Sequence, residues 1–238
     1  VGIESCGGAH YWARELSKLG HEVRMMAPQF VAPYRKGSKN DRNDAEAICE
    51  AAGRPNMRFV PVKTEEQQAV LTVHRARSLM VGERTSLVNQ IRGFLTEYGI
   101  VLPQGRSQVR TQLPHILEDA ENALPYLARE VFADQYMRLC EQDRVILGYD
   151  RKIEALAKAQ EETKRLMQLA GIGPLTATAL VATVGDIRQF KNGRQFAAWL
   201  GLVPRQWSSG GKARHGRITK RGDVYLRTLL IHGARTVM

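Results

Sequence analysis

The stretch from Thr64 to Tyr98, TEEQQAVLTVHRARSLMVGERTSLVNQIRGFLTEY, decides the fold because it predicts one long helix in the middle of the chain. Thr64-Glu65-Glu66 is a typical helix start, since acidic side chains are favourable in a first helical turn. The apolar residues that follow are spaced by four, three and four positions and therefore share one helix face. They are Leu87, Ile91, Phe94 and Tyr98.

A second helical stretch carries apolar side chains at near-heptad spacing: Phe132, Tyr136, Leu139, Ile146, Tyr149 and Ile153. We expect it to pack against the first helix as an antiparallel hairpin, or against a partner chain. Asp143 interrupts the apolar stripe, which favours an ordinary helical core over a long continuous coiled coil. The intervening segment, Gly99 to Pro114, contains Pro103 and Gly105 and is predicted to be a loop.

The residues before Thr64 alternate between short strands and helices, which indicates an α/β sheet. The predicted strands are Val1 to Ile3, His21 to Met26 and Met57 to Val62. The predicted helices are Ala9 to Leu19, Gln29 to Tyr34, and one that opens at Ser38-Lys39-Asn40-Asp41.

After about Leu166, the run Gly171-Ile172-Gly173-Pro174 leads into the apolar segment Leu175 to Val184. Glycines followed by proline at a first helical position resemble a helix-hairpin-helix turn, which can present backbone N–H groups to a phosphate. An ordinary helix–turn–helix corner, with glycines that only cap, is an equally good interpretation. The predicted class is therefore α/β plus α, with regions at 1–63, 64–165 and 166–238.

Positive charge is concentrated at the end of the chain. The last 48 residues, Lys191 to Met238, contain ten Lys or Arg and one acidic residue, Asp223, so they hold +9 of the total +11. A basic segment of this kind is the electrostatic footprint of a nucleic-acid contact.

The composition limits the other classes of protein. Hydrophobic residues at 43% and charged residues at 25% are ordinary for a globular protein. The apolar run Leu175 to Val184 is far shorter than the roughly 20 residues that span a bilayer. Three cysteines without Cys-x-x-Cys spacing indicate neither a disulfide framework nor a structural zinc site. With no signal peptide, we expect a cytoplasmic protein without a membrane partner.

Three carboxylates are candidates for metal chemistry. Asp41 and Asp44 lie three apart at a predicted helix start, with Cβ atoms roughly 5–6 Å apart, close enough to share a divalent ion. From the spacing alone, capping by Asp41 and a favourable dipole contact by Asp44 are the better explanation, because acidic residues are common in first helical turns. Glu4 follows a predicted strand at the sheet edge where ligands usually bind, although a surface Glu on a loop is the commoner situation.

A second candidate site lies within the basic segment. Ser208 and Ser209 precede Gly210 and Gly211, in a predicted loop with cations on both sides: Arg205, Lys212, Arg214 and Arg217. Such a hydroxyl can bind phosphate or act as a nucleophile, and no adjacent residue is an obvious base. Among the aromatic residues, Trp207 is the one suited to base stacking.

Five motifs occur in a fixed order: Gly2-Ile3-Glu4-Ser5-Cys6-Gly7-Gly8; Lys39-Asn40-Asp41-Arg42-Asn43-Asp44-Ala45; Gly171-Ile172-Gly173; Gly201-Leu202-Val203-Pro204-Arg205 running to Ser208-Ser209-Gly210-Gly211; and Lys220-Arg221-Gly222-Asp223 with Leu226-Arg227. Each motif alone is weak, but the ordered set resembles the DEDD transposases of bacterial insertion sequences, the insertion-sequence 110 family. The resemblance covers nearly the whole chain.

The resemblance implies a ribonuclease H- or RuvC-like nuclease domain, a helical, partly coiled-coil linker and a C-terminal transposase domain. It implies that Glu4, Asp41 and Asp44 bind Mg²⁺ or Mn²⁺ and that Ser209 attacks DNA, with Ser208 as the alternative. DNA and phosphate contacts are expected from Gly171, Gly173, Arg205, Lys212, Arg214, Arg217, Lys220 and Arg221. Expected partners are DNA, a structured guide RNA and further copies of the chain, in the bacterial cytoplasm at the nucleoid.

The resemblance also implies that both ends are truncated, because a first Asp is expected on an opening strand and the last helix is expected to continue. We therefore expect the fragment to be catalytically impaired. Two alternatives to a recombinase remain open: a RuvC-like structure-specific nuclease that does not need Ser209, and a catalytically dead nucleic-acid-binding remnant.

Overall fold

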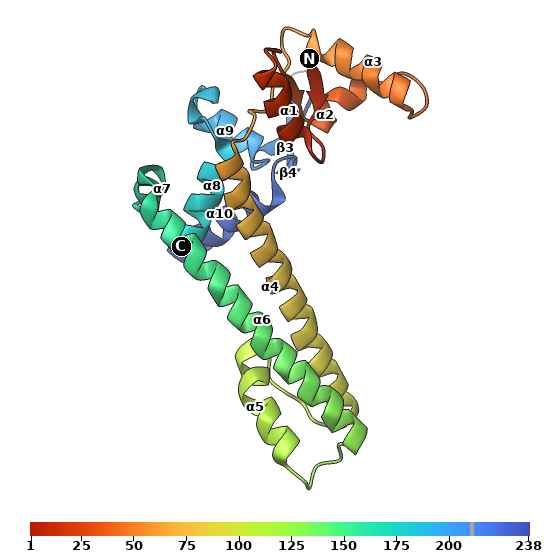
Figure 1. Ribbon diagram of the computed structural model, residues 1–238, viewed down its shortest axis with the longest axis vertical. Coiled ribbons are helices and arrows are strands. Elements are labelled where there is room, and N and C mark those ends of the chain that lie inside the picture. Colours follow the sequence, from red (N-terminus) through yellow and green to blue (C-terminus); the bar gives the residue numbers. More distant parts are fainter. Residues whose placement is uncertain (210–211) are drawn as a thin grey trace. The chain divides into compact units, whose positions relative to one another are not determined.

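The computed structural model describes residues 1–209 and 212–238, with the backbone alone at Ser209 and Ala213. Most of the described chain is helical (Figure 1). Its contacts divide it into two units, Val1–Gln68 with Ala182–Asn192, and Ala69–Val181 with Gly193–Met238. Within the described residues, no helix combines the length and the apolar character that crossing a bilayer requires.

The first unit is built on a two-stranded parallel sheet. Strand β1 (Gly2–Glu4) pairs with β2 (Arg24–Met26), with Ile3 opposite Met25. The helices of this unit are α1 (Ala9–Lys18), α2 (Pro28–Val31), the 3-10 turn η1 (Ala32–Tyr34) and α3 (Asp41–Ala52). Its buried core consists of Met26, Val31, Ala47 and Ala51.

Helix α3 packs closely on β1. A Cβ placed on Gly2 would lie 3.0 Å from Ile48 and 3.1 Å from Ala52, so the glycine allows the second half of α3 to approach the strand. The predicted strand at Val1 to Ile3 is confirmed one residue later, and the one at His21 to Met26 is confirmed in shortened form. The predicted helices of this region are confirmed with small changes in their bounds.

Two predictions for the first unit are wrong. Met57 to Val62 forms no strand; Phe59 makes an isolated bridge to Met26, and the Val60 N–H donates to the Met25 carbonyl at 2.7 Å. The side chain that caps α3 is that of Asn40, not Asp41: its Oδ1 accepts from the Asn43 N–H at 2.8 Å. Asparagine is as good a cap as aspartate, so spacing alone did not distinguish them.

The second unit contains the predicted antiparallel hairpin of long helices, α4 (Glu65–Glu97) and α6 (Tyr126–Ala159) (Figure 1). Two ion pairs between the helices agree with their antiparallel direction. Arg84 pairs with Asp143 at 2.8 Å, and Arg77, earlier in α4, pairs with Asp150, later in α6, at 2.5 Å.

Asp143 therefore has a defined role in the hairpin. Its Oδ1 accepts from both Arg84 and Arg106, each at 2.8 Å. A partly buried carboxylate with two guanidinium partners is compensated for its lost hydration. The residue that interrupts the apolar stripe thus links three successive segments of the unit.

Between the long helices lies α5 (Arg106–Glu118), so the predicted loop from Gly99 to Pro114 is confirmed for residues 99–105 and wrong for 106–114. Pro114 sits inside the helix, where it removes one backbone donor and disfavours helical structure. Val109 and Leu113 on the same helix are fully buried, and we attribute the helix to this burial.

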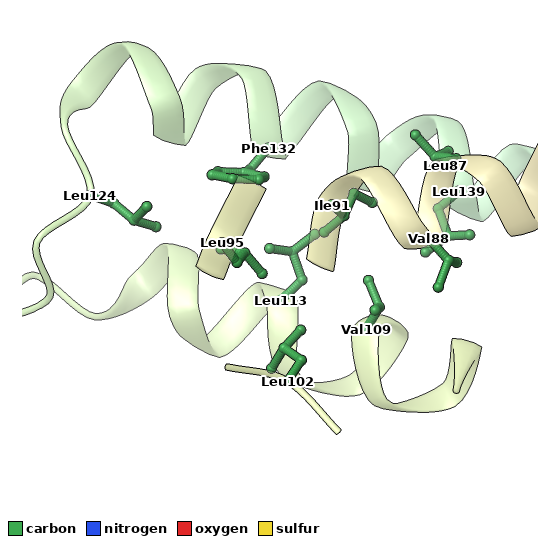
Figure 2. Packing of buried hydrophobic residues seen from close by; sticks show 10 residues of the cluster. All are labelled: Leu87, Val88, Ile91, Leu95, Leu102, Val109, Leu113, Leu124, Phe132 and Leu139. Atoms are coloured by element: carbon green, nitrogen blue, oxygen red, sulfur yellow. The ribbon is translucent and has the colours of Figure 1, made fainter. Parts of the chain in front are cut away.

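The hydrophobic core of the hairpin joins α4, α5 and α6 (Figure 2). Ile91 of α4 and Leu113 of α5 approach one another in its middle, and Phe132 of α6 lies near Leu95. The cluster comprises Leu87, Val88, Ile91, Leu95, Leu102, Val109, Leu113, Leu124, Phe132 and Leu139.

The C-terminal part of the chain begins with α7 (Glu161–Met167) and α8 (Pro174–Val184), followed by η2 (Ile187–Gln189) and α9 (Gly193–Trp199). Then come strands β3 (Pro204–Ser209) and β4 (Lys212–Ile218) and helix α10 (Val224–Val237). The predicted basic loop is thus wrong for residues 205–209 and 212–217, which belong to a two-stranded antiparallel ribbon.

A buried histidine joins three helices of the second unit. His74 of α4 is 1% exposed. The Thr178 hydroxyl of α8 donates to the Pro174 carbonyl at 2.7 Å, so it accepts from His74 Nε2–H at 3.0 Å. His74 Nδ1 then accepts from the Tyr225 hydroxyl of α10, also at 3.0 Å. In this arrangement the neutral imidazole uses both of its ring nitrogens in hydrogen bonds.

We predict that replacing Leu113 by Ala lowers the free energy of unfolding by about 2–5 kcal/mol, the usual cost of truncating a fully buried leucine. Leu79→Ala is the matched control, because Leu79 is 61% exposed. Urea denaturation of both variants measures the difference. Equal stability of the two variants would contradict the observed core.

We predict a pH dependence from His74. Burial lowers its pKa from 6.5 to about 4, so below pH 6.5 the unfolded chain takes up a proton that the folded chain resists. The free energy of unfolding should therefore fall, by about 3 kcal/mol in total, as the pH drops from 6.5 to 4. Urea denaturation across this range should show a shallower pH dependence for His74→Gln than for wild type. The exposed His115 provides the control, His115→Gln, and an unchanged slope in His74→Gln would contradict the assignment.

Candidate functional site

Glu4 is the last residue of β1, at the carboxyl end of the strand where its candidate role requires it. It is half-buried, and the Ser5 N–H that follows donates to the Met26 carbonyl at 2.7 Å. Gly8, with φ 80°, then starts α1 in a conformation that favours glycine. Strand, turn and helix start hold the carboxylate at this end of the sheet.

Asp41 and Asp44 occupy the first turn of α3, as the spacing predicts. Asp41 is exposed, and Asp44 Oδ1 lies 3.4 Å from Arg35 Nη1. The residues of α3 that approach β1 are Ile48 and Ala52, in the second half of the helix. The aspartates are therefore at the end of α3 away from this contact.

The carboxylates fit Mg²⁺ in their chemistry but not in their arrangement. Oxygen ligands of this type are what Mg²⁺ and Mn²⁺ prefer. Among the described residues, however, no three His, Cys, Asp or Glu side chains lie close enough together to hold a metal ion. Glu4, Asp41 and Asp44 are consequently not gathered into one site, and the cation nearest to Asp44 is the guanidinium of Arg35.

The basic residues are gathered on the β3–β4 ribbon. Its register pairs Gln206 with His215, Trp207 with Arg214, Ser208 with Ala213 and Ser209 with Lys212. The predicted phosphate-contacting cations are all exposed, and in the described part of the chain none of them forms an ion pair. They are Arg205, Lys212, Arg214 and Arg217 on the ribbon, with Lys220 and Arg221 at its base.

Positions 208 and 209 of the backbone belong to opposite faces of the ribbon, because successive residues of a strand alternate in direction. Gln206 Nε2 donates to the Ser208 hydroxyl at 2.9 Å, which assigns Ser208 to the face of Gln206. Position 209 shares its face with Trp207. Gly210, Gly211 and the Ser209 side chain lie outside the described residues.

The base of the ribbon is held by backbone contacts that leave no room for side chains. Gly201 has φ 73°, and a Cβ there would lie 2.6 Å from the Arg221 nitrogen. Opposite it, Lys220 has φ 56°, a left-handed conformation that is uncommon outside glycine. The Lys220 N–H donates to the Gly201 carbonyl at 3.0 Å, so a predicted phosphate contact sits on a constrained backbone.

Arg227 is buried at the base of the ribbon. The sequence alone does not identify it as a structural residue. Its Nη1 donates to the carbonyls of Leu200 at 3.2 Å and Gly222 at 3.1 Å. The available signal was an arginine directly after Leu226 at the start of an apolar helix. Asp223 caps that helix by accepting from the Leu226 N–H at 2.8 Å.

The two glycines of the turn before α8 differ in their surroundings. Gly171 has φ 82°, and a Cβ there would lie 2.5 Å from the Gly233 carbonyl oxygen of α10. Close packing against α10 therefore explains why position 171 needs a glycine, and no ligand has to be invoked. No atom lies within 4 Å of a Cβ placed on Gly173, so Gly173 is the position of the two that a phosphate can approach.

A surface hollow of about 450 Å³ in the first unit contains none of the predicted site residues. Its walls combine aromatic, cationic and amide side chains, including Phe30, Tyr34, Asn56 and Arg58. The Arg54 guanidinium lies 5.4 Å from the centre of the Tyr34 ring and pairs with Glu50. Arg54 is therefore engaged in contacts within the first unit, through its interactions with Tyr34 and Glu50.

Comparison with known proteins matches both halves of the chain. A family model for transposases of the IS110 DEDD type matches residues 1–100. A second model, described as "Transposase IS116/IS110/IS902 family", matches residues 163–238.

Individual relatives agree over the full length of the chain. A Pseudomonas aeruginosa protein named "Probable family 20 transposase" is 52% identical over 100% of the chain and 71% of the relative. A Yersinia enterocolitica "Transposase for insertion sequence element IS1328" is 44% identical over 100% of the chain and 70% of the relative. A Coxiella burnetii "Transposase for insertion sequence element IS1111A" is 46% identical over 100% of the chain and 65% of the relative.

The chain thus spans about two thirds of the length of these relatives. Its N-terminal and C-terminal matches follow each other in the order that the sequence motifs predict. On these similarities, the chain belongs to the IS116/IS110/IS902 family of insertion-sequence transposases.

Proposed function

We propose that the protein cleaves and rejoins DNA strands at the ends of an insertion sequence and that Ser209 is the nucleophile. The observation that carries this proposal is the β3–β4 ribbon, which presents exposed cations on both strands around Ser209. Unpaired cations on a surface ribbon attract a polyanion. In transposases of this family, the polyanion that must be bound is the DNA of the element.

The register favours Ser209 over Ser208. Position 209 is directly opposite Lys212, on the face that also carries Trp207 and Arg214. The Ser208 hydroxyl is engaged by Gln206 on the other face. A hydroxyl among cations is the better nucleophile for a phosphodiester, because the cations stabilise charge that develops on the phosphate.

The proposed step conserves the number of phosphoester bonds. The Ser209 oxygen forms a bond to phosphorus and loses its proton, while the bond from phosphorus to one strand end breaks. The departing oxygen gains a proton. Because one phosphoester replaces another, a hydroxyl from a second strand end can reverse the step and rejoin the DNA.

We further propose that residues 1–63 belong to a ribonuclease H- or RuvC-like domain in which Glu4, Asp41 and Asp44 bind Mg²⁺ or Mn²⁺. Such an ion would stabilise charge on the phosphate. No step is assigned to it, because the described carboxylates lie apart. Residues 64–165 would form the helical linker and 166–238 the transposase domain.

The partners of the whole protein are part of the same proposal. DNA is expected on the ribbon, and Gly173 offers a further phosphate contact without sequence preference. Selection of the DNA sites would be delegated to a structured guide RNA, bound by an oligomer of the chain at the bacterial nucleoid.

One observation favours a second candidate, a nucleic-acid-binding protein without cleavage activity. Asp44 is paired with Arg35 instead of with other carboxylates. This candidate predicts that Asp44→Ala and removal of divalent ions leave every observable activity unchanged.

We predict that Ser209→Ala abolishes covalent protein–DNA adducts. The assay uses the chain extended to the full length of its relatives, with Mg²⁺, RNA from the element's flank and a supercoiled plasmid carrying the element junction. Denaturing gels then detect DNA attached to protein. Ser208→Ala is the matched control and should retain the adduct.

The other outcomes of this assay separate the candidates. Free nicks in wild type and Ser209→Ala alike would establish a metal nuclease. DNA binding without any cleavage, unaffected by EDTA, would establish the binding protein. An adduct lost in Ser208→Ala but kept in Ser209→Ala would overturn the assignment of the nucleophile.

We predict that Lys212→Gln lowers the salt dependence of DNA binding. Loss of one phosphate contact should reduce the slope of log K against log salt by about 0.9 for duplex DNA. Fluorescence anisotropy with a labelled duplex at several salt concentrations measures the slope. Lys158→Gln, an exposed lysine on α6, is the control and should leave the slope unchanged.

A further inference from the structure

Trp207 is unusually exposed for a tryptophan in the middle of a strand. It is 58% exposed, although burial of a ring of this size is strongly favourable. A residue whose only task was to hold the ribbon together would cover more of its apolar surface. The exposed ring therefore has surface available for a ligand.

The outer edge of the ring lies against a glycine. A Cβ placed on Gly216 of β4 would lie 2.5 Å from Cζ3 and 2.8 Å from Cη2 of Trp207, but 3.7 Å from Cε3. The glycine therefore makes room for this edge of the ring, and any larger residue at 216 would displace it. With its edge held at β4 and 58% of the residue exposed, the ring leaves flat surface open to the exterior as a platform.

This platform shares its face of the ribbon with the proposed reaction centre. Trp207 is opposite Arg214, and two residues further along β3 Ser209 is opposite Lys212. Residues two apart on a strand point the same way. The opposite face carries Gln206, whose amide is engaged by Ser208.

The need for a free base face indicates which form of nucleic acid fits. Inside a duplex, both faces of each base are covered by its stacked neighbours. A base can stack on the Trp207 ring only where one of its faces is free, as in a single strand or at an unstacked position.

We infer that Trp207 stacks on an unpaired base next to the phosphate that Ser209 attacks. Arg214 and Lys212, on the same face, contact the backbone phosphates on either side of that base. The ligand class is a single-stranded or locally unpaired nucleotide at the point of cleavage. The inference rests on the proposed function for the position of the attacked phosphate, but the stacking itself can be measured without any cleavage.

Intrinsic fluorescence tests the stacking directly. Residues 1–238 contain three tryptophans, so the double variant Trp12→Phe and Trp199→Phe leaves Trp207 as the only tryptophan among them. Addition of a 12-nucleotide oligothymidine should quench its emission saturably, because a stacked base quenches the indole. A 12-base-pair duplex should quench it much less, and oligouridine serves to compare RNA with DNA.

Affinity measurements provide the second readout. Trp207→Ala should weaken binding of the 12-nucleotide oligothymidine by about 5- to 150-fold, the range for loss of one base–aromatic stack. Trp207→Phe should retain part of the affinity. Trp12→Ala is the matched control, because Trp12 is 60% exposed on α1 and should have no effect.

The salt dependence distinguishes stacking from collapse of the ribbon. Trp207→Ala removes no charge, so its slope of log K against log salt should equal that of wild type, whereas Lys212→Gln should lower it. A reduced slope in Trp207→Ala would show that the ribbon has lost its structure. In that case Trp207→Phe, which keeps an aromatic ring, decides: single-strand affinity no better than that of Trp207→Ala, at the wild-type slope, would overturn the inference.

Two further results keep this inference separate from the proposed function. Serine-dependent adducts together with no effect of Trp207→Ala on single-strand affinity would overturn the stacking alone. Trp207-dependent quenching and affinity, with no adduct in the wild-type protein under conditions where DNA is bound, would support the stacking and contradict the role of Ser209.

Discussion

The ribbon depends on one buried charge, the guanidinium of Arg227. A buried cation is costly unless its hydrogen bonds are satisfied, and Arg227 meets this requirement by donating to the Leu200 and Gly222 carbonyls. These carbonyls belong to the segments that enter and leave the ribbon. A two-stranded ribbon has little stability of its own in water, so the position of the proposed nucleophile is determined at its base and not along its strands.

The long helices could be predicted from the sequence because their apolar residues recur at helical spacing, as Leu87 and Ile91 do. The ribbon could not, since both of its faces are exposed and its polar residues show no alternation with apolar ones. Helix α5 was missed for a different reason: Pro114 is a local signal against a helix, and it is overridden by the burial of Val109 and Leu113. Local preferences and tertiary packing disagree at these places.

The sequence predicted on which helix or strand end each carboxylate of the candidate site lies, but not whether the carboxylates lie close together. Glu4 is at the end of a strand, and Asp41 and Asp44 are in a first helical turn, as their spacing indicates. Whether such groups meet depends on how a helix crosses a strand, and α3 contacts Gly2 through Ile48 and Ala52. The direction of the two serines likewise needed the strand register, which no spacing of residues reveals.

The alternation of the ribbon constrains how this chain can vary in length. One residue inserted between Trp207 and Ser209 would transfer the serine to the face of Gln206, because strand neighbours alternate in direction. Two inserted residues would keep the face but move the serine about one strand repeat away from the tryptophan. The strand therefore fixes both the face and the distance of position 209 relative to Trp207. We expect deletions and insertions within β3 to impair the proposed reaction more than most substitutions do, even though the side chains of β3 lie at the surface.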